Sequence, residues 1–107
     1  TPIKSWGRHL WTFIHAICVI DKDTPEQNLK ESKETIKILK SIKNIIPCDA
    51  CKKEWKTHMN SLYTLNLEKP LVLFHWSWQV HNKINKKLNK PTITYEEALQ
   101  KHTKISK

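Results

Sequence analysis

Glycine and arginine are nearly absent from this sequence of 107 residues, which holds only Gly7 and Arg8. It also lacks the Asn-Gly and Gly-Ser pairs that form tight hairpin turns, so it offers poor material for a β-sheet. The net charge of +9 therefore comes almost entirely from lysine. Proteins that read DNA bases rely on the bidentate fork of arginine, so this composition argues against base-specific recognition.

Long apolar runs are absent as well. No segment approaches the ~20 consecutive apolar residues that span a bilayer. The richest stretch, residues 13–20, is short and contains His15. It also lacks the charged leader and the small-residue cleavage site of a signal peptide. We therefore expect no membrane association, and the composition does not indicate a cellular compartment.

Three cysteines are too few for a scaffold held together by disulfides, so the core has to come from apolar packing. Hydrophobic residues make up 38% of the chain, and five tryptophans supply the largest of them. A chain of this length suits one compact domain and is too short for two. We therefore expect a single domain over residues 1–107.

Prolines and capping signals divide the chain into helices. Thr24 with Pro25 and Gln27 is typical of a helix start, and so is Thr94 with Glu97. Apolar residues recur at helical spacing between these signals. The expected helices cover residues 5–20 with Ser5 as the cap, 25–46, 48–59, 70–88 and 95–102. This pattern predicts an all-α fold, a four-helix bundle with a short fifth helix packed against it.

Two of these helices have clear apolar stripes. In the first helix the stripe is formed by Trp6, Leu10, Phe13, Ile14 and Ile17, and in the second by Leu29, Ile36, Leu39, Ile42 and Ile46. Five lysines of the second helix lie on a different face: Lys30, Lys33, Lys37, Lys40 and Lys43. Such a face could bind nucleic acid phosphates, but a solvated face is the simpler interpretation.

The pair Cys48 and Cys51 forms a C-x-x-C motif directly after Pro47, where a helix is expected to begin. Unpaired N–H groups at a helix start stabilise a thiolate and lower the cysteine pKa. Two cysteines at this spacing can exchange a disulfide with a substrate dithiol. The alternatives are half of a zinc site and a pair of buried structural thiols. Redox chemistry is favoured because no second C-x-x-C or H-x-x-x-H supplies further zinc ligands.

Two helices also carry polar and aromatic faces. In the first helix one face holds Arg8, Trp11, His15 and Cys18, and in the fourth one face holds Trp78, His81, Asn82 and Asn85. Asparagine is a weak helix former, so two asparagines in mid-helix beside a histidine indicate hydrogen bonding to something other than backbone. Lysines around the second face could meet a pyrophosphate. Each face could instead be a core stripe or a solvated surface, with Cys18 as a buried thiol.

Together these segments resemble the Erv/ALR family of flavin-linked sulfhydryl oxidases. The resemblance rests on Trp6-Gly7-Arg8-His9-Leu10-Trp11 with His15, on Ile46-Pro47-Cys48-Asp49-Ala50-Cys51, and on Trp76 with residues 81–91. The family patterns are W-G-R-x-x-W-x-x-x-H, Y-P-C-x-x-C and W-x(4)-H-N-x-V-N-x-x-L-G-K-P. Ile46 replaces the usual aromatic residue, Ile84 replaces valine and Asn89 replaces glycine.

The resemblance implies an enzyme that binds FAD noncovalently, forms a homodimer and oxidises thiol-containing protein substrates, passing electrons to dioxygen to give hydrogen peroxide. By the same match Cys48 exchanges with the substrate and Cys51 faces the flavin. The FAD site would be lined by Gly7, Arg8, Trp11, His15, Trp76, His81, Asn82, Ile84, Asn85, Lys87 and Lys90. The few cysteines look most like the compact enzymes of large DNA viruses. The match leaves a nucleic-acid-binding module and a structural zinc domain as the alternatives.

Overall fold

The structure, a computed structural model, describes residues 2–46 and 49–103, and within them the side chains of residues 9–46 and 49–102. These residues form helices and loops with no strand: α1 (Pro2–Cys18), α2 (Pro25–Ile42), α3 (Asp49–Asn60), the 3₁₀ helix η1 (Ser61–Thr64), α4 (Val72–Lys87) and α5 (Tyr95–Thr103). The all-α prediction is confirmed. η1, which continues α3, was not predicted.

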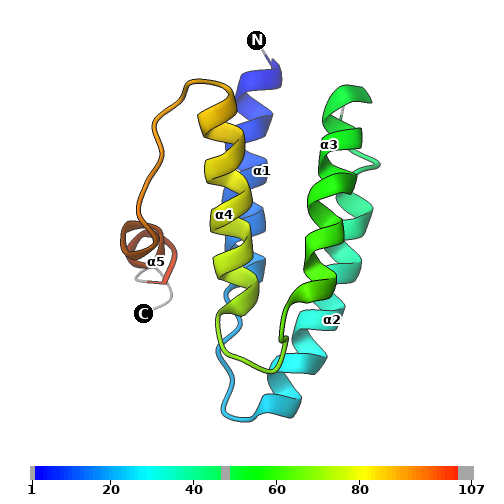
Figure 1. The fold of residues 1–107 in the computed structure, drawn as a ribbon, viewed down its shortest axis with the longest axis vertical. Coiled ribbons are helices and arrows are strands. Elements are labelled where there is room, and N and C mark those ends of the chain that lie inside the picture. The colour runs from blue at the N-terminus through cyan, green and yellow to red at the C-terminus, as the bar shows by residue number, and fades with distance from the viewer. Residues whose placement is uncertain (1, 47–48, 104–107) are drawn as a thin grey trace.

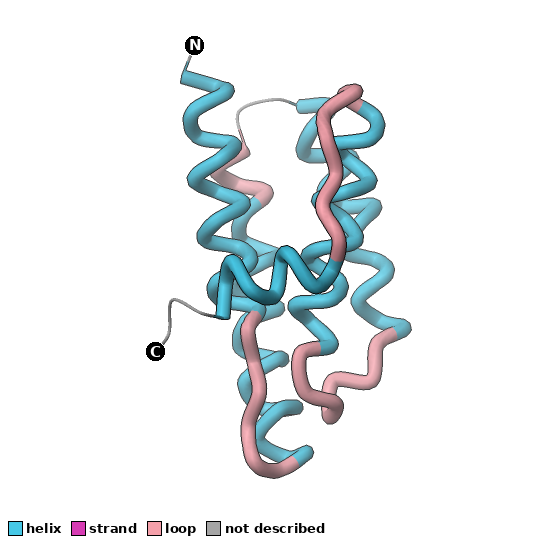
Figure 2. Tube along the Cα trace, turned by 90° about the vertical axis from the view of Figure 1, so that its left-hand side faces the viewer, coloured by secondary structure: helices cyan, strands magenta, loops and turns pink. Residues whose placement is uncertain are grey.

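The first four helices run alternately down and up along the bundle (Figure 1). α1 packs against α2 and α4, and α2 packs against α3. α5 lies across the long helices rather than along them, and it packs mainly against α4 (Figure 2). The N-terminal end of α3 therefore lies at the same end of the bundle as the start of α1 and the end of α4 (Figure 1).

Side-chain caps determine two of the helix starts. Before α2, Thr24 Oγ1 accepts a hydrogen bond from the Gln27 backbone N–H at 3.2 Å, and Pro25 takes the first helical position. Before α5, Thr94 Oγ1 accepts from the Glu97 N–H at 3.1 Å, while Glu97 Oε1 accepts from the Thr94 N–H at 3.2 Å. Both predicted starts are confirmed, and the second is a complete capping box.

The other helix bounds differ from the expected ones by a few residues. α1 already begins at Pro2, a residue suited to the first turn of a helix. α2 ends at Ile42, and a turn with hydrogen bonds from Asn44 to Ser41 and from Ile45 to Ile42 follows. α4 begins at Val72 rather than near Pro70. The reason is that Leu71 has a left-handed backbone with φ of 60°, which no helix continues through.

The core lies along the contact of α1 with α2 and α4. Ile14, Leu39 and Phe74 have no exposed surface, and Trp55 and Trp76 fill the space between α3 and its neighbours. The prediction that Phe13 belongs to the core is wrong. Its side chain is 47% exposed, because its neighbour Ile14 takes the position that faces the other helices. None of the described helices has the length and apolarity that a bilayer crossing requires.

Three polar side chains of α2 that no sequence pattern singles out are buried: Asn28, Ser32 and Thr35. Asn28 connects two loops: its Oδ1 accepts from the Lys22 backbone N–H at 2.9 Å, and its Nδ2 donates to the Glu68 carbonyl at 3.0 Å. A buried amide with both partners in place costs little and fixes the chain path on either side.

α4 ends in a Schellman motif. Asn89 has φ of 58°, and its N–H donates to the Lys86 carbonyl at 3.2 Å. The Lys90 N–H donates to the Asn85 carbonyl at 2.7 Å. These two bonds satisfy the last carbonyls of the helix, and asparagine is the non-glycine residue that best tolerates a left-handed backbone. The turn therefore keeps its shape with asparagine where the family pattern has glycine.

Candidate functional site

Cys51 lies in the first turn of α3 and is exposed. Its predicted partner Cys48 and the preceding Pro47 lie outside the described residues. α3 begins at the end of the bundle where α1 starts and α4 finishes (Figure 1). Cys51 is therefore next to a helix start, at the end of the bundle where the helix of the first motif begins and the helix of the third motif finishes.

His15 and His81, predicted from two separate helices, are in direct contact. His15 Nε2 lies 2.9 Å from His81 Nδ1, and His15 Nδ1 lies 2.9 Å from Ser77 Oγ. His15 is buried, with 5% of its surface exposed, whereas His81 is only partly covered. The antiparallel packing of α1 and α4 produces this contact, because it places residue 15 level with residues 77 and 81.

Trp11 completes this group from one turn earlier on α1. Its ring stacks on the His81 ring with centroids 4.2 Å apart and planes 4° from parallel. Trp55 of α3 makes an edge-to-face contact with Trp11, with the two ring centroids 6.2 Å apart. Trp11, His15 and His81 therefore form one aromatic wall. We call these three residues, together with His102 of α5, the histidine cluster.

His102 of α5 was not identified from the sequence. Its ring lies 4.8 Å from the His15 ring and 5.9 Å from Phe74. Only the crossing of α5 over α4 puts it there, and no periodicity within residues 95–102 reveals that crossing. The capping box predicted the helix itself, but a helix start does not indicate which helix it packs against.

The histidines of this cluster are held uncharged. Burial lowers the pKa of His15 to about 3, with further lowering by His81, His102 and Lys101. Burial also lowers the pKa of His81 to about 4, and Lys101, His102 and Lys90 add to the effect. Burial and then Lys101 lower the pKa of His102. The cluster is thus a neutral aromatic wall with cations around it, which suits a flat anionic ligand.

Cys18 lies on the same α1 face, two turns after Trp11, and is fully buried. Burial raises the pKa of its thiol to about 12. A thiol with this pKa is not a nucleophile at neutral pH. The interpretation of Cys18 as a buried thiol agrees with its environment.

Trp78 and Asn82 both bind the segment that leads from α4 to α5. Trp78 Nε1 and Asn82 Nδ2 donate to the Ile93 carbonyl at 2.9 Å and 2.8 Å. Asn82 Oδ1 accepts from the Ile93 N–H at 3.3 Å. The expectation that Asn82 bonds to something other than backbone is wrong, because both of its side-chain bonds go to the Ile93 backbone, which the path of the segment after α4 brings alongside.

The remaining predicted residues of α4 divide into a buried and an exposed set. Trp76 is buried and its Nε1 donates to Ser61 Oγ at 2.7 Å, so it belongs to the core beside Trp55. Ile84 packs against the core from its edge. Asn85 is half-buried, and its carboxamide bonds to no residue that the structure describes. Lys90 is exposed.

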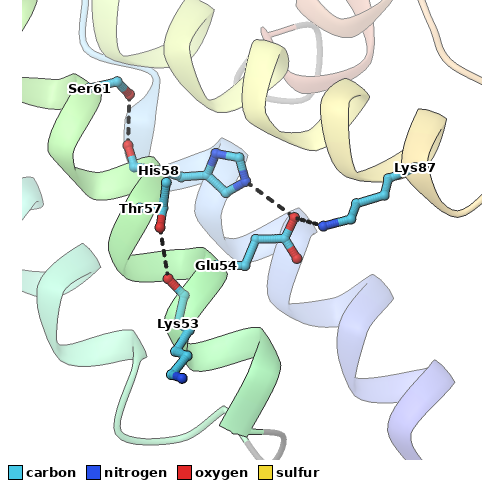
Figure 3. A network of polar contacts seen from close by, with 6 residues as sticks. All are labelled: Lys53, Glu54, Thr57, His58, Ser61 and Lys87. Atoms are coloured by element: carbon cyan, nitrogen blue, oxygen red, sulfur yellow. Dashed lines mark hydrogen bonds and ion pairs between the residues drawn. The ribbon is translucent and has the colours of Figure 1, made fainter.

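Lys87 points across to α3, where its Nζ lies 3.1 Å from Glu54 Oε1 (Figure 3). The same oxygen lies 3.8 Å from His58 Nε2, too far for a hydrogen bond. His58 Nε2 is buried without a hydrogen-bond partner in the described chain. Burial lowers the pKa of His58, Glu54 opposes this, and Lys83 and Lys87 reinforce it. The ion pair of Lys87 with Glu54 thus bridges α3 and α4.

Gly7 and Arg8 belong to the N-terminal half of α1, a helix that begins at the end of the bundle where α3 also begins (Figure 1). The Arg8 side chain lies outside what the structure describes. Among the described side chains, no three His, Cys, Asp or Glu residues gather closely enough to hold a metal ion.

Two sequence comparisons with known proteins show the family of this chain. The sequence model of the Erv1 / Alr family matches residues 8–104. Over 86 residues the chain is 30% identical to the mitochondrial FAD-linked sulfhydryl oxidase ERV1 of Saccharomyces cerevisiae. That match covers 79% of this chain and 43% of the yeast protein, so the chain spans less than half the length of this relative. Because the family model matches most of its length, the chain belongs to the Erv1/Alr family.

Proposed function

We propose that this chain is an FAD-dependent sulfhydryl oxidase that introduces disulfides into protein substrates. The position of Cys51 carries the proposal: it lies exposed in the first turn of α3, within a C-x-x-C motif. The family match and the similarity to the yeast FAD-linked sulfhydryl oxidase support it. A helix start favours the thiolate form of such a cysteine, which is the leaving group that disulfide exchange requires.

The exchange itself uses only the two cysteines. A substrate thiolate attacks Sγ of Cys48 in the Cys48–Cys51 disulfide, forming a mixed disulfide and releasing Cys51 as a thiolate. A second substrate thiolate then attacks the substrate sulfur of the mixed disulfide. The products are an oxidised substrate and a reduced Cys48–Cys51 pair. Two electrons have then moved from the substrate to the cysteine pair. Of the two cysteines, Cys51 is the one proposed to face the cofactor.

The residues of the histidine cluster fit FAD. Trp11 and His81 offer flat aromatic surfaces. In the described chain the His81 ring hydrogen bonds only through Nδ1, to His15, and the Asn85 carboxamide has no partner. Lys90 and Lys101 are close enough to lower the pKa of His81, so the potential around this ring is positive, which suits the pyrophosphate of FAD. The neutral histidines can contact a flavin without adding charge.

When bound, FAD supplies the two-electron acceptor that reoxidises the dithiol and delivers the electrons to dioxygen as hydrogen peroxide. Trp11, His81, Asn85, Lys87 and Lys90 would hold it. The predicted Gly7, Arg8 and His15 would complete the wall on α1. Trp76, Asn82 and Ile84 would act on the site by keeping α4 and the segment after it in position.

The visible absorption spectrum of the purified protein tests the cofactor, with flavin bands expected near ~450 nm. Cys51→Ser and Cys48→Ser should keep these bands and lose oxidation of dithiothreitol. Cys18→Ala is the matched control, because Cys18 is buried and distant from exchange, and it should keep both. A colourless folded protein, or turnover that survives Cys51→Ser, would overturn the proposal.

We further propose a homodimer through the α1–α2 pair. Thr35 Oγ1 donates to the Ile17 carbonyl at 3.4 Å, so Phe13 and Ile38, each about one turn away, are at the same level of the pair. Both are large and exposed, at 47% and 45%. Phe13→Glu should convert the dimer to a monomer in analytical ultracentrifugation, whereas Tyr63→Glu on η1 should not. A wild-type protein that sediments as a monomer at micromolar concentration would refute the dimer.

A further inference from the structure

A groove separates α2 from the end of α3 and η1, away from the histidine cluster. Its volume is about 390 Å³. Its floor is apolar and comes from four segments of the chain: Ile36 on α2, Met59 on α3, Leu62 on η1, and Leu65 and Leu67 in the loop that follows. Neither the C-x-x-C exchange nor the cofactor wall uses these residues.

The rim of this groove is basic. Lys33, Lys37 and Lys40 line it from α2, at spacings of four and three residues that place them along one face. None of the three forms an ion pair with any residue that the structure describes. Lys40 Nζ instead lies 5.7 Å from the ring centre of Tyr63, which is 75% exposed. Three cations without an ion pair thus line one side of a groove with an apolar floor.

This combination selects among ligands. A nucleic acid would use the lysines but gain nothing from a floor of aliphatic side chains. A second copy of this chain, with 19 Lys and Arg residues against 10 Asp and Glu residues, offers little acidic surface to match this rim. An amphipathic helix with apolar anchors and acidic flanks matches both the floor and the rim.

We propose that the groove docks an acidic, amphipathic segment of the protein substrate, a site separate from the cysteines. The proposal rests on the sulfhydryl oxidase function proposed above and specifies the substrate class. Met59 follows Cys51, the described cysteine of the C-x-x-C motif, by eight residues on α3, which corresponds to about 12 Å along the helix axis. An extended chain covers that distance in about four residues. A substrate cysteine that reaches the motif therefore lies at least about four residues from the docked segment.

Binding can be followed directly because Met59 is the single methionine of the chain. With ¹³C-methyl methionine the protein has one labelled methyl resonance, and it belongs to the groove floor. The probe is a synthetic helical peptide with leucines at i, i+4 and i+7 and glutamates elsewhere on its surface. The control peptide has lysine in place of each glutamate. The acidic peptide should shift the Met59 resonance saturably, with weaker binding at higher salt.

Three results of this titration would overturn the proposal. The first is an unmoved Met59 resonance, or an equal response to the lysine peptide. The second is a response to a single-stranded oligonucleotide of the same charge but not to the acidic peptide, which would assign the groove to nucleic acid. The third is a shift that depends on protein concentration without any peptide, which would assign it to a second copy.

Turnover provides the second test. Lys33→Glu, Lys37→Glu and Lys40→Glu combined should raise KM for the same acidic peptide carrying a dithiol by roughly tenfold, with kcat unchanged. Lys30→Glu, Lys43→Glu and Lys69→Glu combined change the net charge equally outside the groove and should leave KM unchanged. An equal rise in both triple variants would show a nonspecific charge effect and overturn the groove. Both variants should oxidise dithiothreitol like wild type.

Failure of the two proposals is distinguishable. If the wild-type protein does not oxidise dithiothreitol, the sulfhydryl oxidase function fails, while the Met59 titration still decides whether the groove binds an acidic helix. If dithiothreitol is oxidised and the Met59 resonance does not move, the docking site fails alone.

Discussion

His15 Nδ1 and Ser77 Oγ lie 2.9 Å apart, and the direction of their hydrogen bond follows from a third group. Ser77 Oγ lies 2.7 Å from the Phe74 carbonyl, which can only accept, so the single hydroxyl hydrogen of Ser77 points there. Ser77 must then accept from His15 Nδ1–H. His15 Nε2 is left as an acceptor for the Nδ1–H of His81 at 2.9 Å. One buried serine therefore determines the tautomers of both histidines.

The first prediction concerns this serine. Ser77→Ala removes the acceptor of a buried imidazole N–H, so the free energy of unfolding should fall by about 1–3 kcal/mol. The His15 tautomer should also become mixed. Urea denaturation measures the first effect, and ¹⁵N chemical shifts of the imidazole nitrogens measure the second.

Ser41→Ala is the control for Ser77→Ala. Ser41 Oγ also donates to a carbonyl one turn earlier, that of Lys37 at 3.1 Å, but it is exposed. Its loss should change stability by no more than about 0.5 kcal/mol. Equal effects of the two substitutions, with His15 still in a single tautomer, would contradict the assigned proton positions.

The second prediction is a loss of stability in acid. The pKa of His15 is lowered to about 3 and that of His81 to about 4, from 6.5 in each case. Between these values and pH 6.5 the unfolded chain binds more protons than the folded chain, so stability is full above pH 6.5 and falls as the pH drops toward 4. The slope is at most about 1.4 kcal/mol per pH unit for each histidine.

Urea midpoints from pH 7.5 to pH 4.5 test this slope. Lys101→Gln removes a cation that lowers the pKa of both histidines, so it should make the slope shallower. A midpoint that stays constant over this range in the wild-type protein would show that the two rings are not buried as neutral groups.

The third prediction concerns the end of α4. Asn89 has φ of 58°, so Asn89→Gly should be neutral or slightly stabilising, whereas Asn89→Ala should cost about 1 kcal/mol in the free energy of unfolding. The two substitutions are matched controls for each other, because both remove the carboxamide and only one can adopt the left-handed backbone without cost. Equal stability of the two variants in thermal unfolding would contradict the Schellman geometry.

Helix starts could be predicted from the sequence because a cap is a local interaction. Thr94 and Glu97 form their reciprocal bonds within four residues, and no other part of the chain has to be in place. Which face of a helix is buried depends on less local interactions. Phe13 and Ile14 are adjacent and equally apolar, and only the direction of the neighbouring helices decides that Ile14 is buried and Phe13 exposed.

The same distinction holds for the candidate site. Trp11 and His15 share an α1 face because of their spacing, and His81 lies on an α4 face for the same reason. That these faces meet depends on the packing of α1 against α4. The position of His102 depends on more. The segment before α5 has to follow a path held by Asn82, whose bonds to Ile93 span eleven residues across the end of α4. Burial of Asn28 likewise needs two loops in place.

The fourth prediction tests this role of Asn82. Asn82→Ala removes both bonds to the Ile93 backbone, so the segment before α5 should open more often and amide hydrogen exchange at Ile93 and Ala98 should become faster. Gln79→Ala changes an exposed side chain on the same helix and should leave exchange unchanged. Unchanged exchange in Asn82→Ala would show that Trp78 alone holds the segment.

The fifth prediction uses the ion pair of Lys87 with Glu54. Under the proposed function Lys87 contributes to FAD binding, yet its ammonium group lies 3.1 Å from a carboxylate of α3. Binding an anionic cofactor must therefore compete with this pair, and an exposed pair contributes no more than about 1 kcal/mol. Glu54→Gln should strengthen FAD binding by about twofold to fivefold. Lys87→Met should weaken it, most strongly at low salt.

Fluorescence quenching of added FAD by the cofactor-depleted protein measures these dissociation constants. Glu26→Gln removes an acidic charge at the opposite end of the bundle, in the first turn of α2, and should have no effect on binding. If Glu54→Gln weakens binding instead, Glu54 supports the site by keeping α3 against α4, and the pair is structural. If Lys87→Met leaves binding unchanged at every salt concentration, Lys87 serves only Glu54, and the positive potential at the cofactor comes from Lys90 and Lys101.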